Sequence, residues 1–383
     1  MRITDVKTYL CGNPWKNWLF LQLETDEGIT GVGEGTLNAF GRSVEATINE
    51  LRPRFIGMDP FQIETLVQRM TRDVYSEGGQ IHGCAVAAVE MACWDIMGKS
   101  LNQPVHNLMG GRYHDKLRAY ANGWYRGERT PEAFADGARE VVRRGYTAMK
   151  FDPFGVAYLV TDRRDEDLSI AIIEAVREAV GPDVDLMIEG HCRFSVASAV
   201  RIGERIEPFN CAWFEEPTPH QDIASVVEVA RHVNVPIATG ESYSSVHQFA
   251  ELLSHHAVHI LQPEPLNLGG LWNARKVIGM AHAFYGVAAP HNAQGPVATA
   301  ASVQLGAACP NLYVAEIFDE FNVDWEREIV DHPVEIVDGY VTVPERPGLG
   351  IELNLDEIMK HPYQEQNFLP LFAEGWQRRV GDQ

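Results

Sequence analysis

Seven ionisable side chains stand at the ends of short apolar runs, and the last six recur at steps of 26, 26, 23, 27 and 25 residues. Such regular spacing places one polar side chain at the same height in each unit of a repeated structure. Several carboxylates that converge in this way repel one another strongly, and a divalent cation resolves the repulsion. Because the ligands are oxygen atoms, Mg²⁺ is favoured over Zn²⁺. The seven residues are Lys150, Glu189, Glu215, Glu241, Glu264, His291 and Glu316.

The elements that must position these residues are short strands that alternate with amphipathic helices. A helix is predicted to begin at Thr130-Pro131, an N-cap followed by an N1 proline, and to reach Arg144 before Gly145. A second is predicted over Asp165–Val180. Eight repeated β/α units imply parallel strands that close into an α/β (β/α)8-type barrel, with its chemistry at the carboxyl ends of the strands. A doubly wound open sheet is the alternative. The strands are expected at 117–122, 147–151, 184–189, 211–215, 236–239, 258–262, 286–289 and 312–316.

The chain before the barrel has a different pattern of apolar and polar residues. Two alternating runs, Ile3–Leu10 and Trp18–Glu24, precede a turn and predict antiparallel strands. Helical stretches follow, the last of which carries one apolar face and is expected to end near Gly98. We therefore predict an α+β capping domain at 1–115, a barrel at 116–322, and a C-terminal segment at 323–383 that returns to the capping domain.

The composition excludes several classes of protein. The 383 residues include 53 acidic and 32 basic side chains, a formal net charge of −21, which argues against nucleic-acid or anionic-membrane partners. No apolar run reaches the roughly 18 residues that a membrane helix needs. The six cysteines form no C-x-x-C motif. We therefore expect reduced thiols and a cytoplasmic location.

The ordered set of strand-end motifs resembles the mandelate racemase subgroup of the enolase superfamily. In the barrel, Phe214-Glu215-Glu216-Pro217, Gly240-Glu241, Leu261-Gln262-Pro263 and Pro290-His291 resemble the motifs of that family. In the capping domain, Trp94–Lys99, Pro104-Val105 and Leu108–Gly111 resemble its signature. The resemblance covers nearly the whole chain, and it points to the acid-sugar (galactonate-type) dehydratases of the subgroup.

That resemblance implies removal of a proton alpha to a carboxylate, with one Mg²⁺ per subunit stabilising the charge that develops. By position, Glu189, Glu215 and Glu241 would be the metal ligands. Lys150 would steady the substrate carboxylate, and Glu316 would bind one of its oxygens. His291 would be the general base, paired with Glu264. In the dehydratases, a histidine at the position of His191 protonates the departing hydroxyl.

Three positions depart from the family pattern. Racemases of this group usually carry Lys-x-Lys at the second strand, whereas this chain reads Lys150-Phe151-Asp152 and lacks the second base. Glu189 and Glu264 stand where aspartate is usual, and the extra methylene moves each carboxylate by roughly 1.5 Å. The missing lysine favours dehydration of an aldonate or aldarate to a 2-keto-3-deoxy acid. An epimerase, a lactone cycloisomerase, and a non-catalytic member that binds a metal or metabolite are the alternatives.

Substrate contacts are also expected from the loops above the barrel. In the family, the loop that holds Trp15 and Trp18 folds over the barrel mouth and helps to choose the substrate. Trp124, just past the first barrel strand, and Asp152, just past the second, are further candidates for contact with an acid sugar. The family forms symmetric assemblies, so a homo-oligomer is expected.

Overall fold

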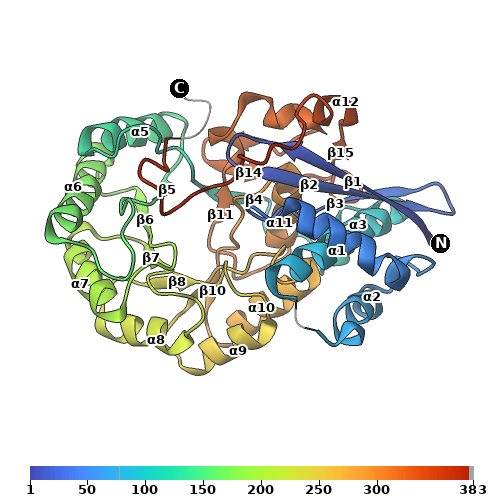
Figure 1. Cartoon of the computed structure of the whole chain (residues 1–383), viewed down its shortest axis with the longest axis horizontal. Coiled ribbons are helices and arrows are strands. Elements are labelled where there is room, and N and C mark those ends of the chain that lie inside the picture. Colours follow the sequence, from blue (N-terminus) through green and yellow to red (C-terminus); the bar gives the residue numbers. More distant parts are fainter. Residues whose placement is uncertain (77, 379–383) are drawn as a thin grey trace.

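The computed structural model describes residues 1–76 and 78–378, which form a capping domain set against a barrel (Figure 1). The cap holds an antiparallel sheet in the order β1-β2-β3, covered by helices. Gly31 and Gly33 allow the sheet to approach a helix closely, because a Cβ at either position would lie within 2.2 Å of the carbonyl oxygen of Ala92 or Ala88. The cap elements are β1 (Ile3–Gly12), β2 (Asn17–Thr25), β3 (Thr30–Glu34), α1 (Gly41–Phe55), α2 (Ile63–Met70), η1 (Arg72–Val74), α3 (Gly79–Leu101) and α4 (Val105–Leu108).

The helix expected to end near Gly98 continues to Leu101 and ends at Asn102, which adopts a left-handed conformation. Gly98 serves a different purpose from the predicted helix stop. A Cβ there would lie 2.5 Å from Gly348 Cα, so this glycine lets the C-terminal segment cross the helix at close range. The sequence prediction was wrong at this point because a glycine required for packing has the same appearance as a helix terminator.

Eight parallel strands close into the barrel, as the repeat predicts. Neighbouring strands pair in chain order from β4 to β10, and β11 pairs with β4. An isolated bridge between Ala288 of β10 and Leu312 connects β10 to the segment before β11. The strands are β4 (Lys116–Ala121), β5 (Ala148–Phe151), β6 (Asp185–Glu189), β7 (Trp213–Glu215), β8 (Ile237–Thr239), β9 (Ile260–Leu261), β10 (Val287–Ala288) and β11 (Ala315–Ile317).

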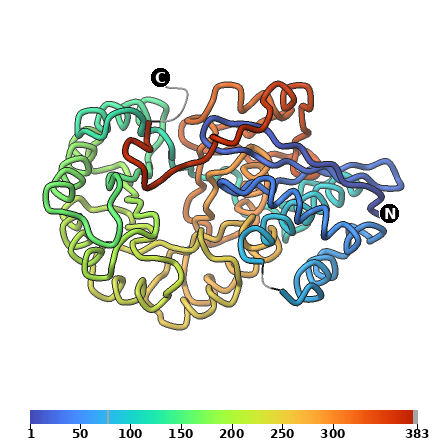
Figure 2. Tube along the Cα trace, in the orientation of Figure 1, coloured from blue at the N-terminus to red at the C-terminus, as the bar shows by residue number. Residues whose placement is uncertain are grey.

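Seven helices surround these strands, one after each of the first seven (Figures 1 and 2). Thr130 is the N-cap of the first, as predicted: its hydroxyl accepts a hydrogen bond from Ala133 N. The 3-10 turns η3 (Asp319–Phe321) and η4 (Asp324–Ile329) follow β11. The helices are α5 (Pro131–Arg143), α6 (Arg163–Val180), α7 (Val196–Ile206) with the turn η2 (Glu207–Phe209), α8 (Ile223–His232), α9 (Val246–Ser254), α10 (Leu271–Ala283) and α11 (Pro296–Ala307).

The C-terminal segment contacts both halves of the molecule. It contains β12 (Val330–Asp331), β13 (Ile336–Val337), β14 (Tyr340–Thr342), β15 (Glu352–Leu353) and α12 (Leu355–Ile358). Strand β14 pairs antiparallel with β4 of the barrel, and Pro362 bridges Cys11 of the cap. The predicted return to the cap is therefore present, whereas the boundaries at 115/116 and 322/323 stay predictions. No helix among residues 1–76 and 78–378 is long and apolar enough to cross a membrane.

Two buried carboxylates of the cap bind the N-termini of two barrel helices. Glu34 accepts hydrogen bonds from the backbone N–H groups of Gly295 and Ala298 at the start of α11, at 2.7 and 2.9 Å. Glu90 accepts from Leu271 N and Trp272 N at the start of α10, both at 2.9 Å. The N-cap residues of these helices are glycines, which offer no side-chain acceptor. The cap therefore supplies the hydrogen-bond acceptors that the N-termini of the two helices lack.

Candidate active site

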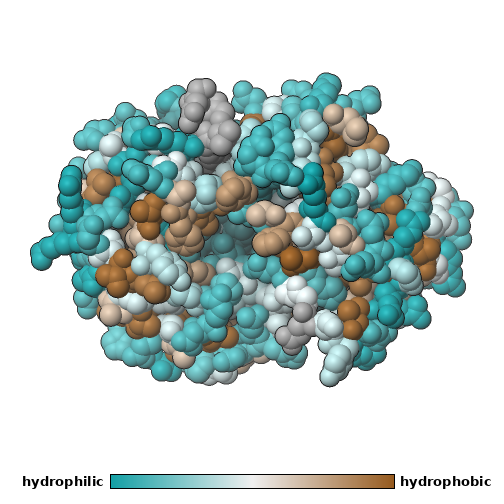
Figure 3. Space-filling model, viewed as in Figure 1, coloured by the Kyte–Doolittle hydropathy of each residue, from teal (hydrophilic) through white to brown (hydrophobic). Residues whose placement is uncertain are grey.

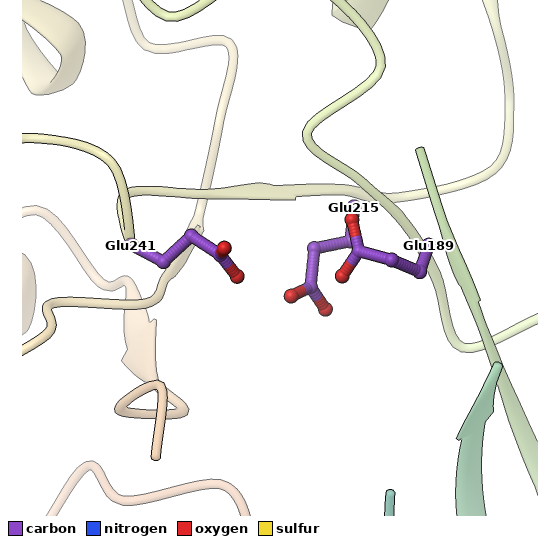
Figure 4. Close-up of side chains that lie close together, drawn as sticks. All are labelled: Glu189, Glu215 and Glu241. Atoms are coloured by element: carbon purple, nitrogen blue, oxygen red, sulfur yellow. The ribbon is translucent and has the colours of Figure 1, made fainter. Parts of the chain in front are cut away.

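Three glutamates from consecutive strands meet at the barrel mouth. Glu189 ends β6, Glu215 ends β7, and Glu241 follows β8. Glu189 and Glu215 are partners in the parallel register of β6 and β7, so both side chains point to the same side of the sheet. One oxygen from each glutamate lies within 4.8 Å of the others, and Glu241 faces the other two (Figure 4). The predicted ligand set is therefore brought together.

Lys150 ion-pairs with three carboxylates at the centre of this group. Its Nζ lies 2.5 Å from Glu215 Oε1, 3.1 Å from Glu316 Oε1 and 3.2 Å from Glu189 Oε2. Burial acts to lower the pKa of Lys150, but Glu215 and Glu316 outweigh it and raise the pKa well above its ordinary value. Lys150 is therefore a permanent cation at the position where the sequence predicts a contact with a substrate carboxylate.

The glutamates respond differently to their common burial. Burial and the neighbouring Glu189 raise the pKa of Glu215 to about 7, and burial raises that of Glu241 well above its ordinary value. Burial also acts to raise the pKa of Glu316, yet Lys150 and His291 hold it at about 2. Glu316 is fixed further by Asn122 Nδ2 and the backbone N–H of Asn292, at 2.8 and 2.7 Å.

The three predicted ligands fit a hard divalent cation. Within the described residues, Glu241 Oε2 and Glu189 Oε2 are buried and accept no hydrogen bond, although Lys150 Nζ lies 3.2 Å from the latter. Buried carboxylate oxygens without donors are costly unless a cation pairs with them. An all-oxygen donor set matches Mg²⁺ better than Zn²⁺, which favours nitrogen and sulfur ligands.

His291 and Glu264 form a hydrogen-bonded pair beside the glutamates. His291 Nδ1 lies 2.7 Å from Glu264 Oε2, and Nε2 lies 3.4 Å from Glu241 Oε2. Glu264 therefore reaches the imidazole despite being longer than the usual aspartate. An ionised carboxylate only accepts, so the bond to Glu264 keeps the proton on Nδ1. Burial acts to lower the pKa of His291, but Glu241 and Glu316 raise it to about 10.

A second histidine–carboxylate pair lies on the other side of the cluster. His191 N donates to Glu189 Oε1 at 2.6 Å, and His191 Nδ1 lies 2.6 Å from Asp152 Oδ2. Asp152 also forms an ion pair with the fully buried Arg193 and accepts from Phe154 N at 2.8 Å. Both oxygens of Asp152 are engaged by the protein, and its contact with the substrate stays a prediction. Asp152 orients His191.

The three tryptophans predicted as substrate contacts occupy different places. Trp15 stacks on Phe318 at a centroid distance of 4.2 Å, in a small cluster with Ala293 close to His291. Trp18 is fully buried in β2 against Trp325, and this prediction is wrong. Trp124 packs its ring on Phe151 and against α5 at Gly137, and its contact with the substrate stays a prediction. Both rings pack in the hydrophobic core, and the alternation of residues and the position of the loop do not reveal this packing.

Sequence reasoning missed several residues of the site. Lys16, in the cap loop between β1 and β2, donates from Nζ to Ala293 O at 2.8 Å and to Gln294 Oε1 at 3.3 Å. Gln294 Nε2 in turn donates to Glu264 Oε2 at 3.3 Å, which connects the cap to the His291 pair. Asn122 and Asn292 follow strand ends as the charged residues do. Their uncharged amides escaped a search for ionisable groups, although their positions offered the same signal.

Comparison with known proteins agrees with this geometry. The enolase C-terminal domain-like model matches residues 133–358, and the mandelate racemase/muconate lactonizing enzyme N-terminal domain model matches residues 13–110. The chain is 34% identical to a D-gluconate dehydratase of Thermoproteus tenax over 94% of this chain and 73% of that protein. It is 31% identical to a D-galactonate dehydratase of Pectobacterium atrosepticum over 94% of both.

The fold is shared with solved structures as well. A putative dehydratase from Mesorhizobium loti superposes with a TM-score of 0.90 at 31% identity, covering 95% of this chain and 99% of that one. A family member from Jannaschia sp. gives 0.90 at 34% identity over 95% and 98%. With both domain models matched and the barrel-mouth residues assembled, the chain belongs to the mandelate racemase/muconate lactonizing enzyme family of the enolase superfamily.

Proposed function

We propose that this protein is a Mg²⁺-dependent hydro-lyase that dehydrates an aldonate or aldarate to a 2-keto-3-deoxy acid. The observation that carries the proposal is the presence of two histidine–carboxylate pairs, His291–Glu264 and His191–Asp152, flanking one cluster of glutamates. Elimination of water requires a base for the C2 proton and an acid for the C3 hydroxyl, and two separate imidazoles can fill these roles. The names of the relatives, which include gluconate and galactonate dehydratases, support the same reaction class.

Each side chain at the barrel mouth has its own role in the reaction. Lys150 pairs with the substrate carboxylate, and Glu316, whose pKa is lowered to about 2, orients the Lys150 ammonium through their ion pair at 3.1 Å. Nε2 of His291 takes the proton from C2, and the electrons of that C–H bond move onto the substrate carboxylate to give an enediolate, to which the proton can still return. In a second step those electrons form the C2–C3 double bond as the C3–oxygen bond breaks. His191 donates a proton to the departing hydroxyl, which leaves as water. The resulting enol takes up a proton at C3 to become the 2-keto-3-deoxy acid.

Glu189, Glu215 and Glu241 would hold the metal ion. Bound there, Mg²⁺ supplies Lewis-acid stabilisation of negative charge near the substrate carboxylate. Glu241 and Glu316 raise the pKa of His291 to about 10. A cation held at Glu241 would oppose that effect and would favour the neutral imidazole that a base requires.

The experiment is a screen of aldonates and aldarates with Mg²⁺ for formation of 2-keto acids. Turnover of at least one acid sugar is expected, and His291→Asn should abolish exchange of the C2 proton with solvent deuterium. Absence of turnover across all common aldonates and aldarates counts against dehydration. Exchange without 2-keto product points to an epimerase, and consumption of lactones points to a cycloisomerase.

The choice of base is tested separately. If His291→Asn still exchanges the C2 proton while Asp152→Asn does not, then His291 is not the base. Metal dependence is checked by removing divalent cations with a chelator and restoring Mg²⁺, which should remove and restore turnover. Full turnover in the chelated protein contradicts the assignment of the glutamates.

A further inference from the structure

The last described residues of the chain leave the cap and cross to the rim of the barrel. After α12 and the bridge to Cys11, residues 370–378 run across the barrel beside β5, where Figures 1 and 2 show them in dark red. The space-filling view shows a hydrophilic hollow in this half of the molecule, bordered by apolar side chains (Figure 3). The sequence predicted a return to the cap but gave no signal for this second crossing.

Trp376 is a buried anchor of this crossing and lies directly against His191. Its side chain is 7% exposed. Its ring stands edge-on to the His191 imidazole, with centroids 5.9 Å apart and planes at 88°. Its Nε1 donates to Gly155 O at 3.2 Å, and its ring packs at 82° on Tyr125. Trp376 therefore connects His191 to the loops that follow β4 and β5.

The same segment also supports the partner of His191. The guanidinium of Arg193 lies 5.5 Å from the ring centroid of Phe372, and Phe372 packs on Tyr158 at 5.7 Å. Arg193 in turn ion-pairs with Asp152, which accepts from His191 Nδ1. The His191 imidazole is thus hydrogen-bonded to Asp152 and packs against the ring of Trp376.

The backbone at His191 needs this support. His191 and Cys192 both adopt positive φ values, +46° and +55°, which L-residues with side chains adopt only at a cost. A conformation of that kind persists when the surrounding contacts specify it fully. An acid that must meet a leaving hydroxyl within hydrogen-bonding distance also loses much of its effect when its ring can turn.

We propose that Trp376 is a positioning residue for His191, and that residues 370–378 hold the His191 imidazole in place at the active site. This inference rests on the proposed dehydration, in which His191 delivers the proton to the C3 hydroxyl. Trp376 acts only through His191, so its loss should impair elimination while leaving removal of the C2 proton by His291 intact.

The test compares Trp376→Ala and Trp376→Phe with Phe368→Ala, a control that lies just before the segment at a residue that is 45% exposed. We expect Trp376→Ala to lower kcat for dehydration about tenfold or more, the scale of a misplaced catalytic group, while C2 deuterium exchange stays within about twofold. Trp376→Phe keeps a ring against His191 and should restore most of the dehydration, and Phe368→Ala should match the unaltered protein. A parallel fall in exchange and dehydration, or no fall in either, overturns the proposal.

A second measurement does not depend on turnover. Diethyl pyrocarbonate modifies accessible imidazoles, and peptide mass analysis gives the rate at His191 itself. The rate should rise several-fold in Trp376→Ala and stay unchanged in Phe368→Ala, and an unchanged rate in Trp376→Ala contradicts the shielding contact. If the unaltered protein dehydrates no acid sugar, the proposed function fails in that assay, whereas the role of Trp376 is still decided by the modification rates.

Discussion

Replacing Glu90 by glutamine should change the pH dependence of stability in a direction that the structure specifies. Glu90 is fully buried in α3 and accepts three N–H donors, from Leu271, Trp272 and the indole of Trp94. Burial outweighs these bonds and raises its pKa from 4.5 to about 7. A glutamine has the shape of the protonated acid and does not titrate in this range.

The magnitude follows from linkage between protonation and folding. The difference between 4.5 and about 7 corresponds to roughly 3 kcal/mol, at about 1.4 kcal/mol for each pKa unit. The folded protein holds this proton more tightly than the unfolded chain does. The stability contributed by Glu90 is therefore fully present below pH 4.5 and is lost as the pH rises through about 7.

The assay is urea unfolding of the unaltered protein and Glu90→Gln at pH 5.0, 7.0 and 8.5. At pH 5.0 the variant should be the less stable by about 1–3 kcal/mol, because its amide nitrogen cannot accept the bond from Leu271 N. Between pH 5.0 and 8.5 the difference in stability should shift toward the variant by up to about 3 kcal/mol. Glu174→Gln, an exposed position on α6, is the control and should give no such trend. If Glu90→Gln loses stability relative to the unaltered protein as the pH rises, the hydrogen bonds outweigh burial and the reasoning is refuted.

Three further predictions concern the active site. Glu215→Gln should abolish binding of Mg²⁺ measured by calorimetry, because Glu215 stands between the other two proposed ligands; retained binding rules out the cluster as the metal site. Asp152→Asn should lower the free energy of unfolding by about 3–5 kcal/mol, because it leaves the buried Arg193 without its counter-charge. The control Asp136→Asn breaks an exposed ion pair and should cost less than about 1 kcal/mol. Equal losses of stability in urea unfolding contradict this account. Lys16→Met should raise KM about tenfold, the equivalent of roughly 1.4 kcal/mol, because the cap loop loses its bonds to Ala293 and Gln294. A lowered kcat at unchanged KM contradicts a role of this loop in substrate binding.

Much of the barrel could be predicted from the sequence because each strand carries its own signal. A short apolar run that ends in a charged residue specifies both the strand and the direction of its last side chain, as at Glu189 and Glu215. The start of the helix after Thr130 could also be predicted from adjacent residues, because an N-cap and an N1 proline lie side by side in the chain. These features depend on neighbours within a few residues.

The features that sequence could not supply depend on contacts between distant segments. Asp152 reads as a loop residue until Arg193 and His191 are placed against it. Trp124 offers an aromatic ring near the mouth, but packing against Phe151 decides which way the ring turns. Trp376 lies in a segment without regular periodicity, so its position near His191 follows only from the path of the folded chain.

Lys150 gives the centre of the barrel its own counter-charge before any ion arrives. Because its ammonium group already neutralises part of the acidic cluster, the polypeptide has no need of a divalent ion to bring these side chains together. Folding is therefore expected not to require the Mg²⁺ proposed for this site. Under that proposal, a chelator should abolish turnover without unfolding the protein.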